Sequence, residues 1–204
     1  MMLAELMRTK FSIAVSGAHG KTTTTSLISH IFLEAQLDPT IIVGGYLDRI
    51  KSNAHYGQGK FLIAETDESD RSLLNLHPTF AVLTTIDLEH MNVYKNLHDV
   101  TSTFNLFLNG LPFYGKAFVC IDDSNIQSLL PLTKTPYLSY GFSDAADFQI
   151  TDMQLKKDVT HYTLYIKKTN QRHSVTVSLP GEHNALNSVA AIAVALEIEL
   201  PIEK

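Results

Sequence analysis

Short apolar runs alternate with amphipathic stretches along the chain as far as about Pro136. Two stretches have apolar positions at helical spacing, Lys21–Ala35 and Asp99–Leu111. Five runs have the length and composition of strands buried on both faces of a sheet: Phe11–Val15, Thr40–Gly45, Phe61–Glu65, Phe80–Ile86 and Lys116–Asp122. This order predicts an α/β fold, a doubly wound and mostly parallel sheet that binds its ligand at the carboxyl ends of the strands.

The hydrophobic pattern changes after Pro136, where polar and apolar residues begin to alternate. Because no helical pattern separates these segments, we predict a small antiparallel β segment near the C-terminal end, with one face in water. An alanine-rich stretch, Gly181–Ile198, then predicts a closing helix. The alternating segments are Asp147–Leu155, Thr160–Lys168 and Arg172–Pro180.

A glycine-rich sequence, SGAHGKTTTTS at residues 16–26, joins the first predicted strand to the first predicted helix. It has the spacing G-x-x-G-K-T, which shortens the phosphate-binding loop G-x-x-x-x-G-K-[ST] because Val15 replaces the first glycine. Glycines let backbone N–H groups close around phosphate oxygens, and the first turn of a helix adds free N–H donors. Lys21 would add a positive charge, and Thr22 a hydroxyl ligand for Mg²⁺.

The alternative interpretation is a glycine turn that only caps a helix. A lysine in an apolar strand-to-helix turn favours an anion instead, so we predict that a nucleotide binds here with Mg²⁺. The residues predicted to contact the nucleotide in this loop are Gly17, Ala18, His19, Gly20, Lys21, Thr22 and Thr23.

Acidic residues follow the strand Phe61–Glu65. Glu65 ends that strand beside the predicted phosphate loop, and a carboxylate in this place holds Mg²⁺ in such ATPases. Asp67, Glu68 and Asp70 come next in a loop. For Asp70 we favour a solvated, helix-capping turn, and for Asp67 and Glu68 both interpretations stay open.

His90 follows the strand Phe80–Ile86, so Lys21, Glu65 and His90 are predicted to face one crevice at the carboxyl ends of the strands. A histidine in such a place is more often a surface or structurally bonded residue. Imidazole is also an unusual ligand for Mg²⁺, which prefers carboxylates and water.

The closing helix begins with a second polar group. Asn184 and Asn187 are three residues apart and therefore share a helix face, and His183 stands at the helix start. From the residues alone, a functional and a structural interpretation are equally supported.

Composition narrows the possible partners. The 204 residues are enough for one well-buried domain, and the formal charge of −5 comes without a Lys/Arg cluster, so neither nucleic acid nor a membrane surface is indicated. The single Cys120 suits a reducing cytosol. No apolar run has the length of a membrane span, and Glu5 interrupts the apolar start, unlike a secretory signal. We therefore expect a cytoplasmic protein.

Four features together resemble the central ATPase domain of the Mur ligases, over essentially the whole chain. They are the G-x-x-G-K-T loop, the strand ending in Glu65, the segment T-x-I-x-x-[DE]-H ending at His90, and the segment G-x-H-N-x-x-N ending at Asn187. Four stretches are more specific: MLAELM, LIAETDESD, LPFYGKAFVCIDD and PGEHNALN. They most resemble the family members that join L-alanine to UDP-N-acetylmuramate.

The resemblance implies an ATP-dependent amide ligase of peptidoglycan synthesis. In that reaction ATP phosphorylates the muramate carboxylate, and the amine of L-alanine attacks the acyl phosphate. The resemblance gives catalytic roles to Lys21, Glu65 and His90. Lys21 would bind the β and γ phosphates, Thr22 and Glu65 one Mg²⁺, and His90 a second metal. The residues expected to contact adenosine are His183, Asn184 and Asn187.

The chain departs from the family pattern at several positions. Ala18 stands where Thr or Ser is usual, and Thr85 where Asn is usual. Glu89 and Asn92 stand where Asp is usual on either side of His90-Met91. We expect the changes at these two positions to affect the geometry of the second metal site more than nucleotide binding.

Members of this family carry an N-terminal domain for the UDP-sugar and a C-terminal domain that closes over ATP, and we recognise neither in this sequence. We therefore expect residues 1–204 to be an excised or truncated central domain that is inactive alone. Two alternatives stay open. One is another Mur-type ligase, such as the one that reattaches recycled tripeptide, and the other is a non-catalytic nucleotide-binding module.

Overall fold

The computed structural model describes residues 2–201. Its helices are α1 (Met2–Thr9), α2 (Lys21–Glu34), α3 (Leu97–Asn109), α4 (Ser124–Leu129) and α5 (Glu182–Glu197), with 3₁₀ turns η1 (Ser72–Asn75) and η2 (Leu130–Leu132). Its strands are β1 (Phe11–Ser16), β2 (Thr40–Leu47), β3 (Ser52–His55), β4 (Phe61–Glu65), β5 (Phe80–Leu83), β6 (Lys116–Cys120), β7 (Tyr137–Gly141), β8 (Phe148–Lys156), β9 (Val159–Ile166) and β10 (Gln171–Val177).

All these strands belong to one sheet in the order β10-β9-β8-β7-β6-β5-β1-β4-β2-β3. The strands from β2 to β8 in this order pair in parallel, whereas β3 at one edge and β9 and β10 at the other pair antiparallel. The central strand β1 lies between β4 and β5, with Val15 opposite Glu65 and Ser16 opposite Leu83. The carboxyl ends of β1, β4 and β5 therefore lie side by side where these central strands terminate.

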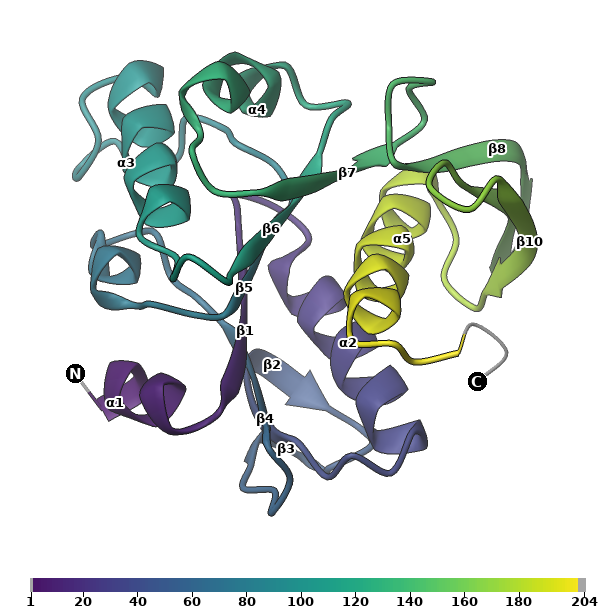
Figure 1. Cartoon of the computed structure of the whole chain (residues 1–204), viewed down its shortest axis with the longest axis horizontal. Coiled ribbons are helices and arrows are strands. Elements are labelled where there is room, and N and C mark those ends of the chain that lie inside the picture. The colour runs from purple at the N-terminus through teal and green to yellow at the C-terminus, as the bar shows by residue number, and fades with distance from the viewer. Residues whose placement is uncertain (1, 202–204) are drawn as a thin grey trace.

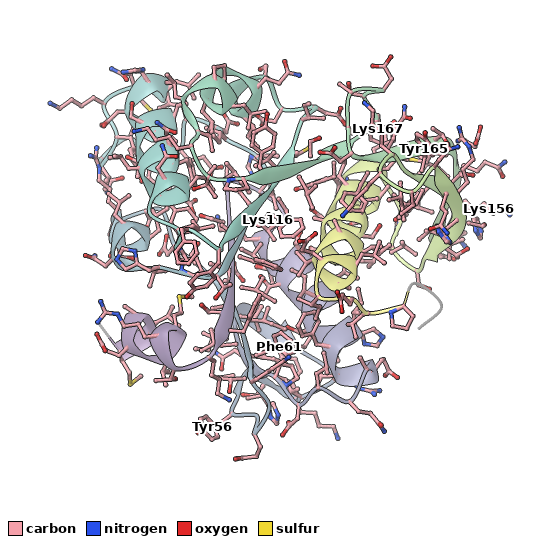
Figure 2. All side chains as sticks on the ribbon, in the orientation of Figure 1. Tyr56, Phe61, Lys116, Lys156, Tyr165 and Lys167 are labelled. Atoms are coloured by element: carbon pink, nitrogen blue, oxygen red, sulfur yellow. The ribbon has the colours of Figure 1, made fainter. Side chains whose placement is uncertain are left out.

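Helices cover both faces of the sheet, as the predicted doubly wound fold requires (Figure 1). Helices α1, α3 and α4 lie on one side of the central strands, and α2 and α5 lie on the other. The buried alanines of α5 allow it to pack closely on α2. Phe61, labelled in Figure 2, packs edge-to-face on Phe11 and Phe32, with ring centroids 5.5 and 5.0 Å apart.

The antiparallel strands β8, β9 and β10 extend the sheet past β7 and curve around α5 (Figure 1). Tyr165 and Lys167 in Figure 2 mark this extension, at a distance from the central strands. Along β9 buried residues alternate with more exposed ones, which confirms the predicted strand with one wet face.

The structure corrects the predicted elements in three places. The strand predicted to reach Ile86 ends at Leu83, because the chain then turns toward the β1–α2 loop, with Thr84 bonded through its hydroxyl to His19 O. The antiparallel pattern starts later than Pro136, since β7 still pairs in parallel with β6. The short elements β3, α4 and β7 were not predicted.

No helix among residues 2–201 is long and apolar enough to cross a membrane. Cys120 is buried at the end of β6, and this burial raises the pKa of its thiol to about 12. The thiol is therefore neutral at physiological pH and serves as a packing residue.

Candidate nucleotide and cation site

The loop between β1 and α2 is tightly fitted to its surroundings. Gly17 and Gly20 have positive φ angles of 129° and 82°. A Cβ atom on Gly17 would lie 2.3 Å from Thr84 Oγ1, and one on Gly20 would lie 2.6 Å from Asn187 Oδ1. Both glycines are therefore required by conformation and by space.

The segment that follows β5 holds this loop from one side. Ala18 N donates to Thr85 O at 2.9 Å, and His19 N donates to Thr85 Oγ1 at 2.9 Å. The Thr84 hydroxyl donates to His19 O at 2.5 Å. The loop leads directly into α2, whose first N–H groups lack acceptors within the helix. These donors and the positive end of the helix dipole favour a bound anion.

Lys21 extends from the first turn of α2 back over the loop. Its Nζ donates to Gly17 O at 2.5 Å, to Ala18 O at 3.2 Å and to Glu68 Oε1 at 3.0 Å. The side chain of Lys21 is 17% exposed and that of Glu68 only 5%. The sequence left the role of Glu68 open, and the structure places it at the centre of the site as a buried partner of Lys21.

Thr22 and Glu65, predicted to hold one Mg²⁺, lie next to each other. Thr22 Oγ1 donates to Glu65 Oε1 at 2.9 Å, and Gly44 N donates to Glu65 Oε2 at 2.7 Å. The contact follows from the register, because Glu65 lies opposite Val15 near the end of β1. A hydroxyl and a carboxylate in contact beside a helix N-terminus are suitable ligands for a hard cation.

His90 contacts Glu68. Its Nε2 lies 3.5 Å from Glu68 Oε1, and one ligand atom each from Glu68, Glu89 and His90 lie within 4.8 Å of one another. Glu68 Oε2 is buried and has no hydrogen-bond partner among residues 2–201. A buried carboxylate oxygen without a donor is costly, and a cation at this position would compensate it. These residues therefore fit a divalent ion.

Lys21, Glu65 and His90 are predicted to face one crevice, and the structure adds Glu68 as a residue that contacts two of them. Glu68 contacts both Lys21 and His90, whereas no ion pair or hydrogen bond joins Glu65 to His90 within the described residues. The other two loop carboxylates form local turns: Asp67 accepts from Ser69 N and Asp70 from Ser72 N, each at 2.8 Å. Asp70 therefore forms an exposed turn beside η1, and Asp67 forms a similar turn where no helix begins.

A cavity of about 420 Å³ adjoins the loop on the side of α5. Asn187 Oδ1 accepts from Thr24 Oγ1 at 3.1 Å, and Asn184 Nδ2 donates to Pro180 O at 2.8 Å. The structure therefore brings the two sequence motifs to one cavity. Its lining comes from the loop, the segment after β5, β7 and the start of α5: His19, Gly20, Thr23, Thr84, Thr85, Tyr140, Leu179, His183, Asn184, Leu186 and Asn187.

Tyr140 is a lining residue that sequence reasoning missed. Burial raises the pKa of its hydroxyl well above the usual range, and the neutral hydroxyl donates to Leu83 O at 3.2 Å. Its signal in the sequence is weak, because Tyr140 lies in the short strand β7, which was not predicted.

A second cavity of about 420 Å³ lies between α2, α5 and β10. Its lining is mainly apolar and includes none of the loop, carboxylate or histidine residues described above. Its polar side chains are His173, Ser174 and Thr176, and none of them belongs to the nucleotide or cation site described above.

A family model described as the Mur ligase middle domain matches residues 15–195. Among curated proteins, the UDP-N-acetylmuramate--L-alanine ligase of Geobacter sp. (strain M21) is 48% identical over 202 residues, which are 99% of this chain and 44% of that protein. The ligase of the same name from Syntrophotalea carbinolica is 46% identical over 203 residues, with 100% and 44% covered. The chain thus spans less than half the length of these relatives.

Solved structures with the same fold include several ligases. The UDP-N-acetylmuramate:L-alanyl-gamma-D-glutamyl-meso-diaminopimelate ligase from Neisseria meningitides has a TM-score of 0.85 at 22% identity and covers 98% of this chain and 65% of its own. The UDP-N-acetylmuramate-alanine ligase from Thermotoga maritima has a TM-score of 0.83 at 21% identity, with 98% and 44% covered. A MurF ligase from Thermotoga maritima, in complex with ADP, has a TM-score of 0.77 at 18% identity, with 98% and 49% covered.

Proposed function

The chain belongs to the Mur ligase family, and from this premise we propose that residues 1–204 are the nucleotide-binding middle domain of a ligase that joins L-alanine to UDP-N-acetylmuramate. The main support for the proposal is that three features lie together at the carboxyl ends of the central strands. They are the β1–α2 loop, the carboxylates of Glu65 and Glu68, and the cavity beside α5. The relatives with 46–48% identity favour L-alanine as the amino acid. Because the chain spans about 44% of their length, the complete reaction is assigned to a longer protein.

In this proposal the nucleotide occupies the cavity and the loop together. The phosphates lie at the N-terminus of α2, where backbone N–H groups and Lys21 bind them. The adenosine lies in the cavity, where the side chains of His183, Asn184 and Asn187 contact it. Lys21 already has three acceptors, so a phosphate oxygen would replace one of the loop carbonyls that it now contacts.

Two groups of residues fit the Mg²⁺ ions that accompany ATP. Thr22 and Glu65 would hold one ion near the loop, and Glu68, Glu89 and His90 would hold the other. At position 89 the family usually has Asp, and Glu89 keeps a carboxylate ligand there. Bound Mg²⁺ would neutralise the phosphates and make the γ-phosphorus easier to attack.

The chemistry then depends on position rather than on a protein nucleophile. A carboxylate oxygen of UDP-N-acetylmuramate attacks the γ-phosphorus of ATP and ADP leaves, after which the amine of L-alanine displaces phosphate from the acyl phosphate. Lys21 and the N–H groups of the loop fix the γ-phosphate and stabilise the charge on its oxygens during transfer. Holding reactants in this way can contribute roughly 7–11 kcal/mol to lowering the barrier.

The test compares the full-length gene product with residues 1–204 alone. Each is mixed with UDP-N-acetylmuramate, ATP, Mg²⁺ and either L-alanine or the tripeptide L-Ala-γ-D-Glu-meso-diaminopimelate, and product and phosphate are followed by mass spectrometry and a phosphate assay. We expect the L-alanine product from the full-length protein, and nucleotide binding without product from residues 1–204. Tripeptide product would identify another Mur-type ligase, and binding without any turnover by the full-length protein would identify a non-catalytic module. Product from residues 1–204 alone would contradict the proposal that this chain is a middle domain that needs the flanking domains for catalysis.

A further inference from the structure

Tyr94 connects the two loops that supply the candidate cation ligands. Its hydroxyl donates to Glu68 O at 2.5 Å, and its backbone N–H donates to His90 O at 3.1 Å. The residue is 1% exposed. One buried residue therefore links the backbone of Glu68, in the loop after β4, through its side chain to that of His90, in the loop after β5, through its own N–H.

Tyr94 is itself held firmly. The guanidinium of Arg71 lies over its ring, 5.0 Å from the centroid, and donates to Asp99 Oδ2 at 2.6 Å. Asp99 lies in the first turn of α3 and also accepts from Lys95 N at 3.2 Å. The ring is thus braced by Arg71, which α3 holds through Asp99.

The ligands on either side need such support, because neither lies in a helix or strand. Glu68 belongs to the irregular segment between β4 and η1. His90 has a φ of 53°, a left-handed conformation that costs free energy in residues other than glycine. Contacts with Val93 N at 2.8 Å and Tyr94 N at 3.1 Å hold its carbonyl.

We propose that Tyr94 is a positioning residue for the cation site, whose hydroxyl and N–H set the separation of the Glu68 carboxylate from the His90 imidazole. The inference rests on the proposed function, since it assumes that these ligands hold the ion accompanying the nucleotide. A phenylalanine ring would fill the same buried space, so packing of the ring alone does not require a tyrosine hydroxyl at this position. Removing the hydroxyl leaves Glu68 O without this buried donor and frees the loop to shift. Mutating a residue that orients a metal ligand typically lowers metal affinity about 10–100-fold.

Burial raises the pKa of the Tyr94 hydroxyl. The hydroxyl is therefore a neutral donor at neutral pH.

The experiment measures Mn²⁺ binding by electron paramagnetic resonance, with a non-hydrolysable ATP analogue present. In Tyr94→Phe we expect Mn²⁺ affinity to fall about tenfold, while the analogue binds with unchanged affinity in EDTA. Tyr162→Phe is the matched control, because that buried hydroxyl bonds to Ser188 Oγ at 2.6 Å on the β9–α5 side, outside the cation site. A purely structural effect would lower the melting temperature of both variants and leave Mn²⁺ affinity unchanged.

The variant and the wild-type chain test two different proposals, the positioning role of Tyr94 and the cation site itself. Wild-type Mn²⁺ affinity in Tyr94→Phe would overturn the positioning role, whatever the melting temperature. Failure of the wild-type chain to bind Mn²⁺ with the analogue would instead overturn the proposed cation site, and the inference with it. Should Tyr94→Phe not fold, Asp99→Asn weakens the brace and keeps the hydroxyl. We then expect a smaller loss of Mn²⁺ affinity, and an unchanged affinity would overturn the inference.

Discussion

The two sides of the candidate site are built in different ways. On the nucleotide side, Gly17 to Thr22 are consecutive residues whose shape is set by two glycine conformations and by hydrogen bonds of the loop backbone to Thr84 and Thr85. On the cation side, Glu68, Glu89 and His90 come from two irregular loops. Their separation depends on long-range contacts to Lys21 and Tyr94.

This difference predicts how each side responds to mutation. The nucleotide side is intolerant of added atoms, because its backbone is packed against side chains. The cation side is sensitive to the removal of partners, because the buried carboxylate of Glu68 there depends on its neighbours. Substitutions that add a methyl group and substitutions that remove a charge therefore distinguish the two sides.

The largest effect should come from Lys21→Ala, which affects both sides. Nucleotide binding should be lost, and the buried carboxylate of Glu68 should lose its cationic partner. We expect the free energy of unfolding to fall by about 3 kcal/mol, the lower end of the range for a broken buried ion pair. Chemical denaturation and titration calorimetry measure the two effects.

The double variant Lys21→Ala/Glu68→Gln separates these effects. Neutralising Glu68 should restore most of the stability without restoring nucleotide binding. If the single variant is as stable as the wild type, the buried ion pair is not an important part of this site.

A smaller effect is expected from Gly20→Ala on the nucleotide side. The new Cβ would lie 2.6 Å from Asn187 Oδ1, and the φ of 82° is strained for alanine. We expect a loss of about 1–3 kcal/mol in stability and a clear loss of nucleotide affinity. Gly110→Ala is the matched control, because Gly110 has a φ of −84° and lies outside the site. Equal nucleotide affinity in both variants would show that the loop is more adaptable than its packing indicates.

Glu65→Gln should act more selectively. The amide keeps the size of the side chain, so we expect unfolding to change by less than about 1 kcal/mol. Nucleotide affinity with Mg²⁺ should fall at least about tenfold, whereas affinity in EDTA should stay the same, because the carboxylate acts through the ion. An equal loss under both conditions would mean that Glu65 supports the loop through Thr22 and Gly44 rather than a cation.

The smallest effect concerns the core beneath both sides. The pKa of Cys120 is about 12 in the folded protein against an ordinary 9.0, so the unfolded chain loses this proton first as pH rises. Stability should be unaffected by this group below pH 9 and should fall between pH 9 and pH 12. Urea midpoints at pH 8 and 10.5 measure the fall, which should be shallower in Cys120→Ala. An identical slope in the variant would assign the alkaline loss to other groups, such as the buried tyrosines.

Much of the fold and one side of the site were predictable, because they depend on residues close together in the sequence. The strand, loop and helix from Phe11 to Glu34 show glycine spacing and helical periodicity within a short window. The edge strand β3 and the short helix α4 gave no comparable signal, since each is only a few residues long.

Glu68 could not be assigned from sequence, although it lies in a recognisable acidic loop. Asp67, Glu68 and Asp70 look alike as solvated turn residues, and two of them form such turns. Glu68 differs because Lys21, 47 positions earlier, and Tyr94, 26 positions later, surround it in the folded chain. Burial created by distant segments is not visible in a local pattern.

The central claim is that the two sides form one site for a magnesium-bound nucleotide. Titration calorimetry of residues 1–204 with a non-hydrolysable ATP analogue, in Mg²⁺ and then in EDTA, tests it most directly. We predict binding to one nucleotide site that is tighter with Mg²⁺ and whose Mg²⁺ dependence is reduced in Glu68→Gln, where the ion held by Thr22 and Glu65 remains. Absence of binding, or binding that is equally tight with and without Mg²⁺, would contradict the claim.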